Sequence, residues 1–274
     1  MLLQGKIAVI YGAGGSLGGA VASSLAKAGA KVFLTGIHQA SVQKTCDKIR
    51  AEGHFAEMAI VNALDINDVS QHMDDLLNKE GLVHISFNAI GLQDIQNIPL
   101  IDMALQDFLR PVSIAMETQF ITCTTAGKAM IKQGNGVILS LTATPGGIGY
   151  PTVGGFGPAC CAIEGFSRNL ASELGPFGVR VVNIRSAGSP DSKPFKDALA
   201  YDEEGSRSFL RKLEDDTMLK TLPIMEDIGN AAVFLSSEMA SKITGITLDV
   251  TCGTTTALNY KIPSITFVQG QTRT

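Results

Sequence analysis

The chain alternates short apolar runs with segments of helical periodicity along most of its length. Strands that alternate with helices pair in parallel through right-handed crossovers. The order therefore predicts an α/β fold on a doubly wound parallel sheet. A single domain with a large core suits 274 residues at 45% hydrophobic content. The expected strands are 7–10, 32–34, 55–60, 83–87, 136–141, 179–184 and 246–250.

Two segments break this alternation. The stretch 188–222 mixes many charges with aromatic and aliphatic residues, so we expect a small helical lid inserted over the sheet edge. Residues 254–274 lack periodicity and are expected to form a loose or exchanged tail. The predicted organisation is one domain over 1–253, which contains the lid, followed by that tail. A long helical region is expected at about 102–132, where Pro111 marks a helix start or a kink.

Composition limits the expected partners and compartment. The net charge is −4 without a basic stripe, which argues against nucleic acid as a partner. No apolar run is long enough to span a membrane, and the N-terminus leads directly into a strand pattern without a signal peptide. The five cysteines form no Cys-x-x-Cys pair and have no histidine at zinc-binding spacing. We therefore predict no metal site, and reduced thiols in the cytoplasm.

A glycine-rich turn, Tyr11-Gly-Ala-Gly-Gly-Ser-Leu-Gly18, joins the first strand to the first helix. Small residues there let the backbone approach a pyrophosphate at a helix N-terminus. Ser16 in this turn either crowds such a phosphate or hydrogen-bonds to it. A bare tight turn also needs glycine, but the place between strand and helix favours a nucleotide. The candidate contacts are Gly12, Gly14, Gly15, Ser16, Leu17 and Gly18.

The second half of the chain resembles a known family. A buried strand at 136–141 precedes a helix that opens Phe156-Gly-Pro-Ala-Cys160 and feeds another strand. With the glycine-rich turn, Asn88-Ala89 and the glycine-rich end 243–253, this passage resembles the short-chain dehydrogenase/reductase family over about residues 5–253. The resemblance implies a Rossmann-like fold and a nicotinamide cofactor. It also implies hydride transfer to or from a small carbonyl, enone or imine-type substrate.

The same resemblance implies four catalytic groups, and this chain lacks them at the matching positions. The family's helix opens Tyr-x-x-x-Lys, where this chain has Phe156 and Cys160. The family's serine falls at Ala143, and its asparagine falls at Ala115. A related variant with Tyr-x6-Lys would place its tyrosine at Val153, so that pattern fails too. Four concordant mismatches between well-matched flanks predict an atypical active site.

Three residues near these vacant positions are candidates for catalysis. Thr142 or Tyr150 could orient a carbonyl. Cys160 could be a nucleophile if a neighbour lowered its pKa. Plainer explanations stand beside these, because a threonine at a strand end satisfies backbone groups and a cysteine in an Ala/Gly-rich helix packs.

The end of the second strand bears on the choice of cofactor. NAD-selective sites place a carboxylate there, and none occurs over 35–39, which favours NADP and leaves NAD possible. Ile37 stands where NADP-type members of the family often carry an arginine. His38 either meets a 2′-phosphate or is a solvated loop histidine.

The resemblance assigns further contacts to the cofactor. Asn62 and Ala63 fall where the family holds the adenine. Asn88, Ala89 and Ile90 follow the fourth strand, and Ile90 stands in place of a glycine, so it narrows the cofactor cleft. The alternative is that this strand end only packs the core.

Three functions stay open. The first is a nucleotide-dependent oxidoreductase with atypical chemistry, the second is a non-redox enzyme such as a lyase that reuses the cleft, and the third is a catalytically silent binding or assembly subunit. Helical segments 102–132 and 156–174 carry small and apolar residues on more than one face, including Ala126, Met130 and Phe166. In the family these helices form a symmetric interface, which predicts a homodimer or homotetramer.

Overall fold

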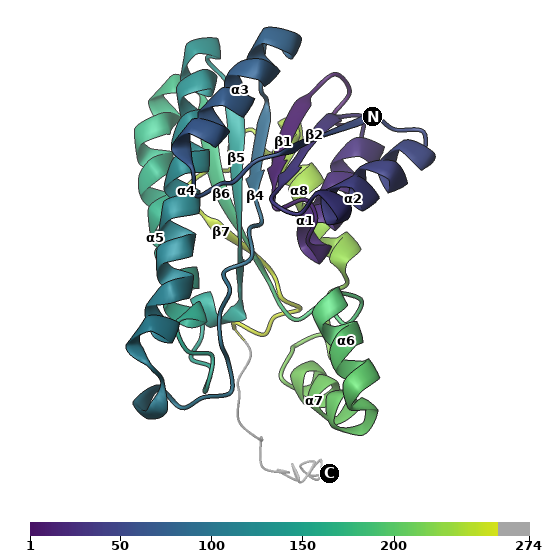
Figure 1. Cartoon of the computed structure of the whole chain (residues 1–274), viewed down its shortest axis with the longest axis vertical. Coiled ribbons are helices and arrows are strands. Elements are labelled where there is room, and N and C mark those ends of the chain that lie inside the picture. The colour runs from purple at the N-terminus through teal and green to yellow at the C-terminus, as the bar shows by residue number, and fades with distance from the viewer. Residues whose placement is uncertain (257–274) are drawn as a thin grey trace, which may run out of the picture.

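A computed structural model shows a seven-stranded, all-parallel sheet with the strand order β3-β2-β1-β4-β5-β6-β7 (Figure 1). The structure describes residues 1–256, so most of the predicted tail at 254–274 lies outside the described residues. The predicted α/β, doubly wound, Rossmann-like fold in one domain is confirmed. The strands are β1 (Ile7–Tyr11), β2 (Lys31–Gly36), β3 (Ala56–Ile60), β4 (Ile85–Asn88), β5 (Gly136–Ala143), β6 (Val179–Ser186) and β7 (Thr247–Val250).

Helices cover both faces of the sheet and divide the core into two layers. One layer holds α1 (Ser16–Lys27), α2 (Gln39–Ala51) and α8 (Met225–Ser236), and the other holds α3 (Ile66–Glu80), α4 (Leu105–Gln133) and α5 (Phe156–Leu174). Strand β1 shows how the sequence serves both layers. Ala8 and Ile10 face the first layer, whereas Val9 and Tyr11 face the second. A parallel strand buried on both faces must be apolar throughout, which explains why these strands read as continuous apolar runs.

The long helix α4 begins at Leu105 and continues through Pro111. Because the helix is already formed before Pro111, the expectation of a helix start there is wrong. Proline removes one backbone hydrogen bond from the helix interior without ending the helix. The first turns of α4 pack tightly on the chain that leads into α5. A Cβ on Gly155 would lie 1.9 Å from the Phe108 carbonyl oxygen, so only glycine fits before α5. Short 3-10 turns complete the chain: η1 (Leu100–Asp102), η2 (Thr144–Gly146), η3 (Gly175–Phe177) and η4 (Glu238–Ala240).

The segment 188–222, expected as a lid, contains two helices, α6 (Lys193–Tyr201) and α7 (Glu203–Asp215). Both lie beyond the carboxyl end of the sheet, below α1 and α8 in the view of Figure 1. The lid packs on the end of β6, because a Cβ on Gly188 would lie 2.7 Å from the ring of Phe195 and 3.5 Å from Leu213. It therefore stands beside the edge of the sheet where the candidate site lies.

Candidate functional site

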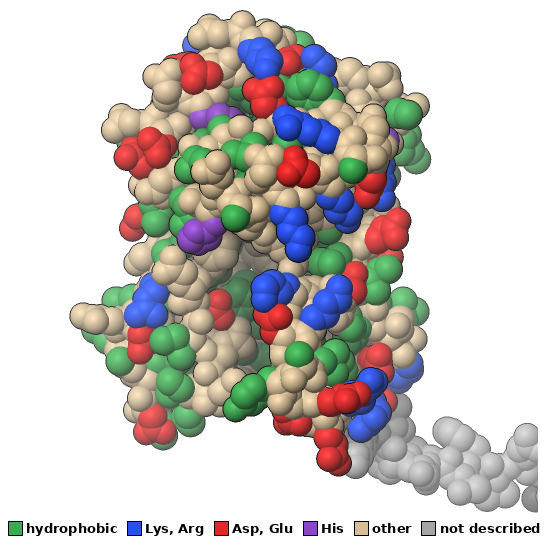
Figure 2. Space-filling view, turned by 45° about the vertical axis from the view of Figure 1, so that its right-hand side comes forward, with side chains coloured by type: hydrophobic (Ala, Val, Ile, Leu, Met, Phe, Trp, Pro, Cys, Tyr) green, Lys and Arg blue, Asp and Glu red, His purple; other side chains and the backbone are tan. Residues whose placement is uncertain are grey.

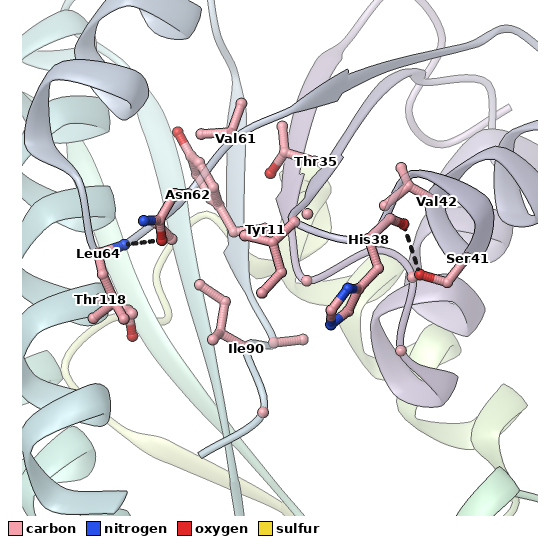
Figure 3. A pocket seen from close by; sticks show the side chains of 18 of the residues that line it. Tyr11, Thr35, His38, Ser41, Val42, Val61, Asn62, Leu64, Ile90 and Thr118 are labelled. Carbon is pink, nitrogen blue, oxygen red and sulfur yellow. Dashed lines mark hydrogen bonds between the residues drawn. The ribbon is translucent and has the colours of Figure 1, made fainter. Parts of the chain in front are cut away.

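A cavity of about 490 Å³ opens at the carboxyl ends of the first four strands (Figure 3). Strand order reverses there between β1 and β4, which is where open α/β sheets bind ligands. Figure 2 shows the molecule hollowed between its upper body and its lower part, with Lys and Arg side chains above and below the hollow. The lining includes Gly12, Gly14, Gly15, Ile37, His38, Ser41, Asn62, Ala63, Ala89, Ile90, Ile114 and Thr118.

The glycine-rich turn brings backbone close to backbone at one side of this cavity. Gly12 has φ +81°, and a Cβ there would lie 2.6 Å from the Ala89 carbonyl oxygen. Gly18 is equally constrained, because its Cβ would lie 2.3 Å from the Gly12 carbonyl oxygen. Gly15 is different: it caps α1 without a side-chain hydrogen bond and is exposed. The first N–H groups of α1 are thus available to an anion, as a nucleotide phosphate requires.

Ser16 makes a contact that the sequence analysis did not foresee, and its expected contact with a phosphate stays a prediction. Its Oγ accepts a hydrogen bond from the Lys193 backbone N–H at 3.0 Å, which joins the start of α1 to the start of the lid helix α6. Ser16, Leu17 and Gly18 are not among the residues that line the cavity, although Gly12, Gly14 and Gly15 are. Leu17 instead packs against the first core layer. Only the first half of the glycine-rich turn therefore lines the cavity.

The opposite wall of the cavity comes from the ends of β3 and β4. The Asn62 side-chain Oδ1 accepts from the Leu64 N–H at 3.1 Å, so its amide NH₂ is left facing solvent and the cavity. Asn88 is buried and does not line the cavity. Its Nδ2 donates to Thr122 Oγ1 at 2.9 Å, and its Oδ1 accepts from the Ile90 N–H at 3.1 Å. Asn88 thus sets the conformation of the Ala89–Ile90 turn, which supplies the lining.

Tyr11 is one of the lining residues that the sequence analysis missed. Its side chain is fully buried, and its hydroxyl has no hydrogen-bond partner in the described structure. Burial raises the pKa of this phenol well above its ordinary value. The available signal was a tyrosine directly before the glycine-rich turn. Together with Ile90, it makes this end of the cavity more apolar and narrower than a glycine-lined cleft (Figure 3).

The positions expected to be catalytic lie away from the cavity. Ala115 is fully buried in a small apolar cluster with Ala159 and Ile163, and Phe156 packs against the same cluster. Cys160 is 1% exposed, and burial raises the pKa of its thiol to about 12. A thiol with that pKa stays protonated at neutral pH, which favours packing over nucleophilic attack.

Thr142 and Tyr150 differ in their surroundings. The Thr142 hydroxyl is buried, accepts from Asn183 Nδ2 at 2.7 Å and donates to Glu164 Oε1 at 2.9 Å. The single hydrogen-bond donor of this hydroxyl and one of its two acceptor positions are therefore used inside the protein. Tyr150 is half-buried in the loop after η2 and does not line the cavity.

A buried charge network beside Thr142 was also missed. The Arg185 guanidinium donates from Nε to Glu164 Oε1 at 2.9 Å and from Nη1 to Asp249 Oδ1 at 3.0 Å. These residues tie α5 to β6 and β7 underneath the loop that follows β5. An arginine near the end of β6, a strand that also carries Arg180 and Asn183, was the sequence signal.

Comparison with known proteins agrees with this geometry. The family model described as enoyl-(acyl carrier protein) reductase matches residues 12–255. The chain belongs to the short-chain dehydrogenase/reductase family. This family member is 28% identical to (+)-borneol dehydrogenase 2 of Salvia officinalis over 92% of this chain and 90% of that protein. It is also 28% identical to 7alpha-hydroxysteroid dehydrogenase of Escherichia coli strain K12, over 94% and 97% of the two chains.

Solved structures show the same fold. Levodione reductase superposes with a TM-score of 0.86 at 22% identity, covering 93% of this chain and 100% of that chain. Gluconate 5-dehydrogenase from Burkholderia cenocepacia in complex with NADP and tartrate gives 0.84 at 22% identity, over 93% and 97%.

Two further properties concern residues 1–256 alone. No helix there is both long and apolar enough to cross a lipid bilayer. No group of three or more His, Cys, Asp or Glu side chains within that range is arranged to hold a metal ion.

Proposed function

We propose that the protein is an NADP(H)-dependent oxidoreductase that transfers hydride to or from a small carbonyl, enone or imine-type substrate by atypical chemistry. The observation that carries this proposal is the cavity at the sheet switch point, where the uncapped start of α1 meets a glycine-rich turn. Backbone N–H groups there suit a phosphate, and the apolar far wall suits an adenine. The borneol and hydroxysteroid relatives are dehydrogenases, which supports the same reaction class.

The preference for NADP rests on the second strand. No carboxylate lines the described cavity near Ile37 and His38, where an acidic side chain would repel a 2′-phosphate. His38 and the start of α2 lie beside that place. The five free cysteines, of which three are buried, support a reducing, cytoplasmic location.

The atypical chemistry rests on the four residues at the family's catalytic positions. Ala115, Ala143 and Phe156 have no ionisable side chain, and burial withholds the Cys160 thiol from a substrate and raises its pKa. General acid–base catalysis contributes roughly 10²–10⁴-fold, so ordinary alcohol oxidation is expected to be slow. An activated alkene or iminium accepts hydride with less need for a protein acid.

A second candidate is a non-redox enzyme or a catalytically silent binding or assembly subunit. The burial of Thr142 and Cys160 favours it, since neither side chain is free to meet a substrate in this conformation. Turnover separates the two candidates. Hydride transfer from NADPH to a panel of conjugated carbonyls and imines supports the first, and binding without turnover supports the second.

The phosphate site is tested with a matched pair of variants. Gly15 is the cap of α1 with extended φ −79° and ψ 163°, a conformation that aspartate and serine both accept as helix caps. Gly15→Asp adds a negative charge where the phosphate is expected, whereas Gly15→Ser adds a smaller, neutral hydroxymethyl group. We expect titration calorimetry to show NADPH binding weakened at least tenfold more by aspartate than by serine. Equal NADPH affinities of the aspartate and serine variants would refute the proposed site. The absence of heat when the natural chain is titrated with NADPH or NADH would refute it as well.

A further inference from the structure

The cavity covers only one half of the cleft that a dinucleotide needs. Its lining comes from β1, β2 and α2, from the chain after β3 and β4, and from α4. Among residues 1–256, none of its lining comes from β5, β6, α5 or the lid. The adenosine side is therefore a preformed cavity, and the side toward the catalytic positions is not part of it.

Three side chains on that second side are buried. Thr142 is 4% exposed at the end of β5, and Cys160 is 1% exposed on α5. In the turn between β6 and α6, Ser189 is 3% exposed, and its Oγ is buried without a partner in the described structure. The lid helices press on the same turn through Phe195 and Leu213 against Gly188. A nicotinamide ring has to displace these contacts.

The Ser16–Lys193 hydrogen bond lies at the boundary between the two halves. Ser16 is the first residue of α1, and Lys193 is the first residue of the lid helix α6. The N–H of a first helical residue has no partner within its own helix, so a serine hydroxyl there satisfies a free donor. The bond joins residues 177 positions apart. Closing it holds the lid against the glycine-rich turn.

We propose that Ser16 is a latch that keeps the lid over the nicotinamide half of the cleft. The latched protein binds adenosine phosphates that end at the first phosphate, and it admits the whole dinucleotide only when the Ser16–Lys193 bond opens. This inference rests on the proposed function, in which the cleft binds NADP(H). Ser16 is thus a residue that sets ligand specificity through the position of the lid.

The latch predicts a difference between two ligands. Adenosine 2′,5′-bisphosphate occupies the open half and leaves the latch closed. NADPH binds only when this hydrogen bond opens. The net free energy of one such bond corresponds to roughly two- to tenfold in affinity. Removing the latch should therefore strengthen NADPH binding by about that factor and leave the bisphosphate unchanged.

Three variants open the latch from its two sides. Ser16→Ala and Ser16→Gly remove the acceptor. Lys193→Pro removes the donor N–H, and proline suits the first helical position because Ser192 before it is extended, with φ −76° and ψ 157°. Lys193→Arg is the matched control, since it keeps both the backbone N–H and the charge.

Calorimetric titration of the natural chain and the four variants with both ligands tests the inference. Tighter NADPH binding in all three latch variants, with unchanged bisphosphate affinity and an unchanged control, is the expected result. An NADPH affinity that is the same in natural and latch variants overturns the latch, as does an equal change for both ligands. If the natural chain and every variant bind neither ligand, the proposed function itself fails, a result that the latch alone does not produce.

Discussion

At the scale of single residues, the proposed site has two ends that differ: one suits a phosphate, and the other lacks side chains for proton transfer. Gly12, Gly15 and Ala89 build a wall on which a phosphate and a ribose can lie. In the proposed function, Ala143, Phe156 and Cys160 take the positions of the family's proton-transfer groups. Phosphate binding depends on backbone N–H groups, which any small side chain preserves, whereas proton transfer depends on particular side chains. The two ends of one cleft can therefore diverge independently.

Restoring the missing side chains tests this division. We expect the triple variant Ala143→Ser, Phe156→Tyr and Cys160→Lys to gain measurable NADPH-dependent reduction of a reactive diketone, from a natural level that is slow or undetectable. A lysine at 160 is buried, but Glu164 lies one helical turn away and compensates part of its charge. The gain is read as NADPH oxidation at 340 nm, with Phe156→Tyr alone as the control. Rapid ketone reduction by the natural chain would show that another residue supplies the proton.

At the scale of elements, the pair formed by Glu164 and Arg185 fastens α5 to β6. Their side chains are 10% and 11% exposed, so Glu164 would be a buried charge without Arg185, and Arg185 without Glu164 would keep Asp249 as its only acidic partner among the described residues. Asp249 on β7 meets the same guanidinium, but its side chain is 34% exposed. Water can replace the Asp249 contact and cannot replace the Glu164 contact.

This difference in burial predicts that removing Glu164 and removing Asp249 lower the free energy of unfolding by unequal amounts. Glu164→Ala should lower the free energy of unfolding by about 3 kcal/mol, because it removes the buried partner of Arg185 and leaves only the more exposed Asp249. Asp249→Ala should cost less than about 1 kcal/mol, as expected for a pair open to solvent. Urea denaturation of the two variants checks the order. A cost at Asp249 equal to that at Glu164 would contradict the importance of burial here.

A histidine at the amino ends of β1 and β4 gives a prediction about pH. His84 Nδ1 accepts a hydrogen bond from the Ile7 N–H at 3.0 Å, which requires an unprotonated nitrogen. Burial lowers the pKa of His84, and the nearby ammonium of Lys6 lowers it further. The folded state therefore binds fewer protons than the unfolded state below the ordinary pKa of 6.5. This contribution is present above that pH and is lost as the pH falls through the lowered value.

His84→Asn keeps an acceptor near the place of Nδ1 but cannot titrate. We expect the natural chain to lose more stability than the variant when unfolding is measured at about pH 7.5 and again at about pH 5.5. The variant itself serves as the control for all other titrating groups. Equal losses in the two proteins would show that His84 is not a source of the pH dependence.

The elements were largely predictable from sequence and the contacts between them were not. The predicted strand at 136–141 extends two residues further in β5, and the predicted helix at 156–174 is α5 itself. Apolar periodicity is a local property, so it fixes strands, helices and their alternation. The partner of Ser16 lies 177 positions along the chain, and Arg185 finds Glu164 only when α5 packs on β6. Local patterns carry no information about such pairs.

At the scale of the whole molecule, the outer face of α4 exposes Leu105, Leu109 and Phe120 among polar side chains. Ala126 and Met130, which the sequence analysis named among residues on more than one face, lie on the face that is buried against the sheet. Phe120 is 56% exposed, and its ring centroid lies 6.5 Å from that of Phe166 on α5. A second copy of the chain placed about a two-fold axis would cover this aromatic pair on both protomers.

We propose that the chain is a homodimer or homotetramer, and that Phe120 lies in an interface. Light scattering at micromolar concentration should give two or four times the chain mass of 28.8 kDa. Phe120→Lys should shift the mass toward the monomer, because burying an unpaired ammonium in an interface core is costly. Phe209→Lys on the lid helix α7 is the matched control, since Phe209 is 53% exposed and lies away from α4 and α5. A natural chain that is monomeric at this concentration, or a control that dissociates as readily as Phe120→Lys, would refute this interface.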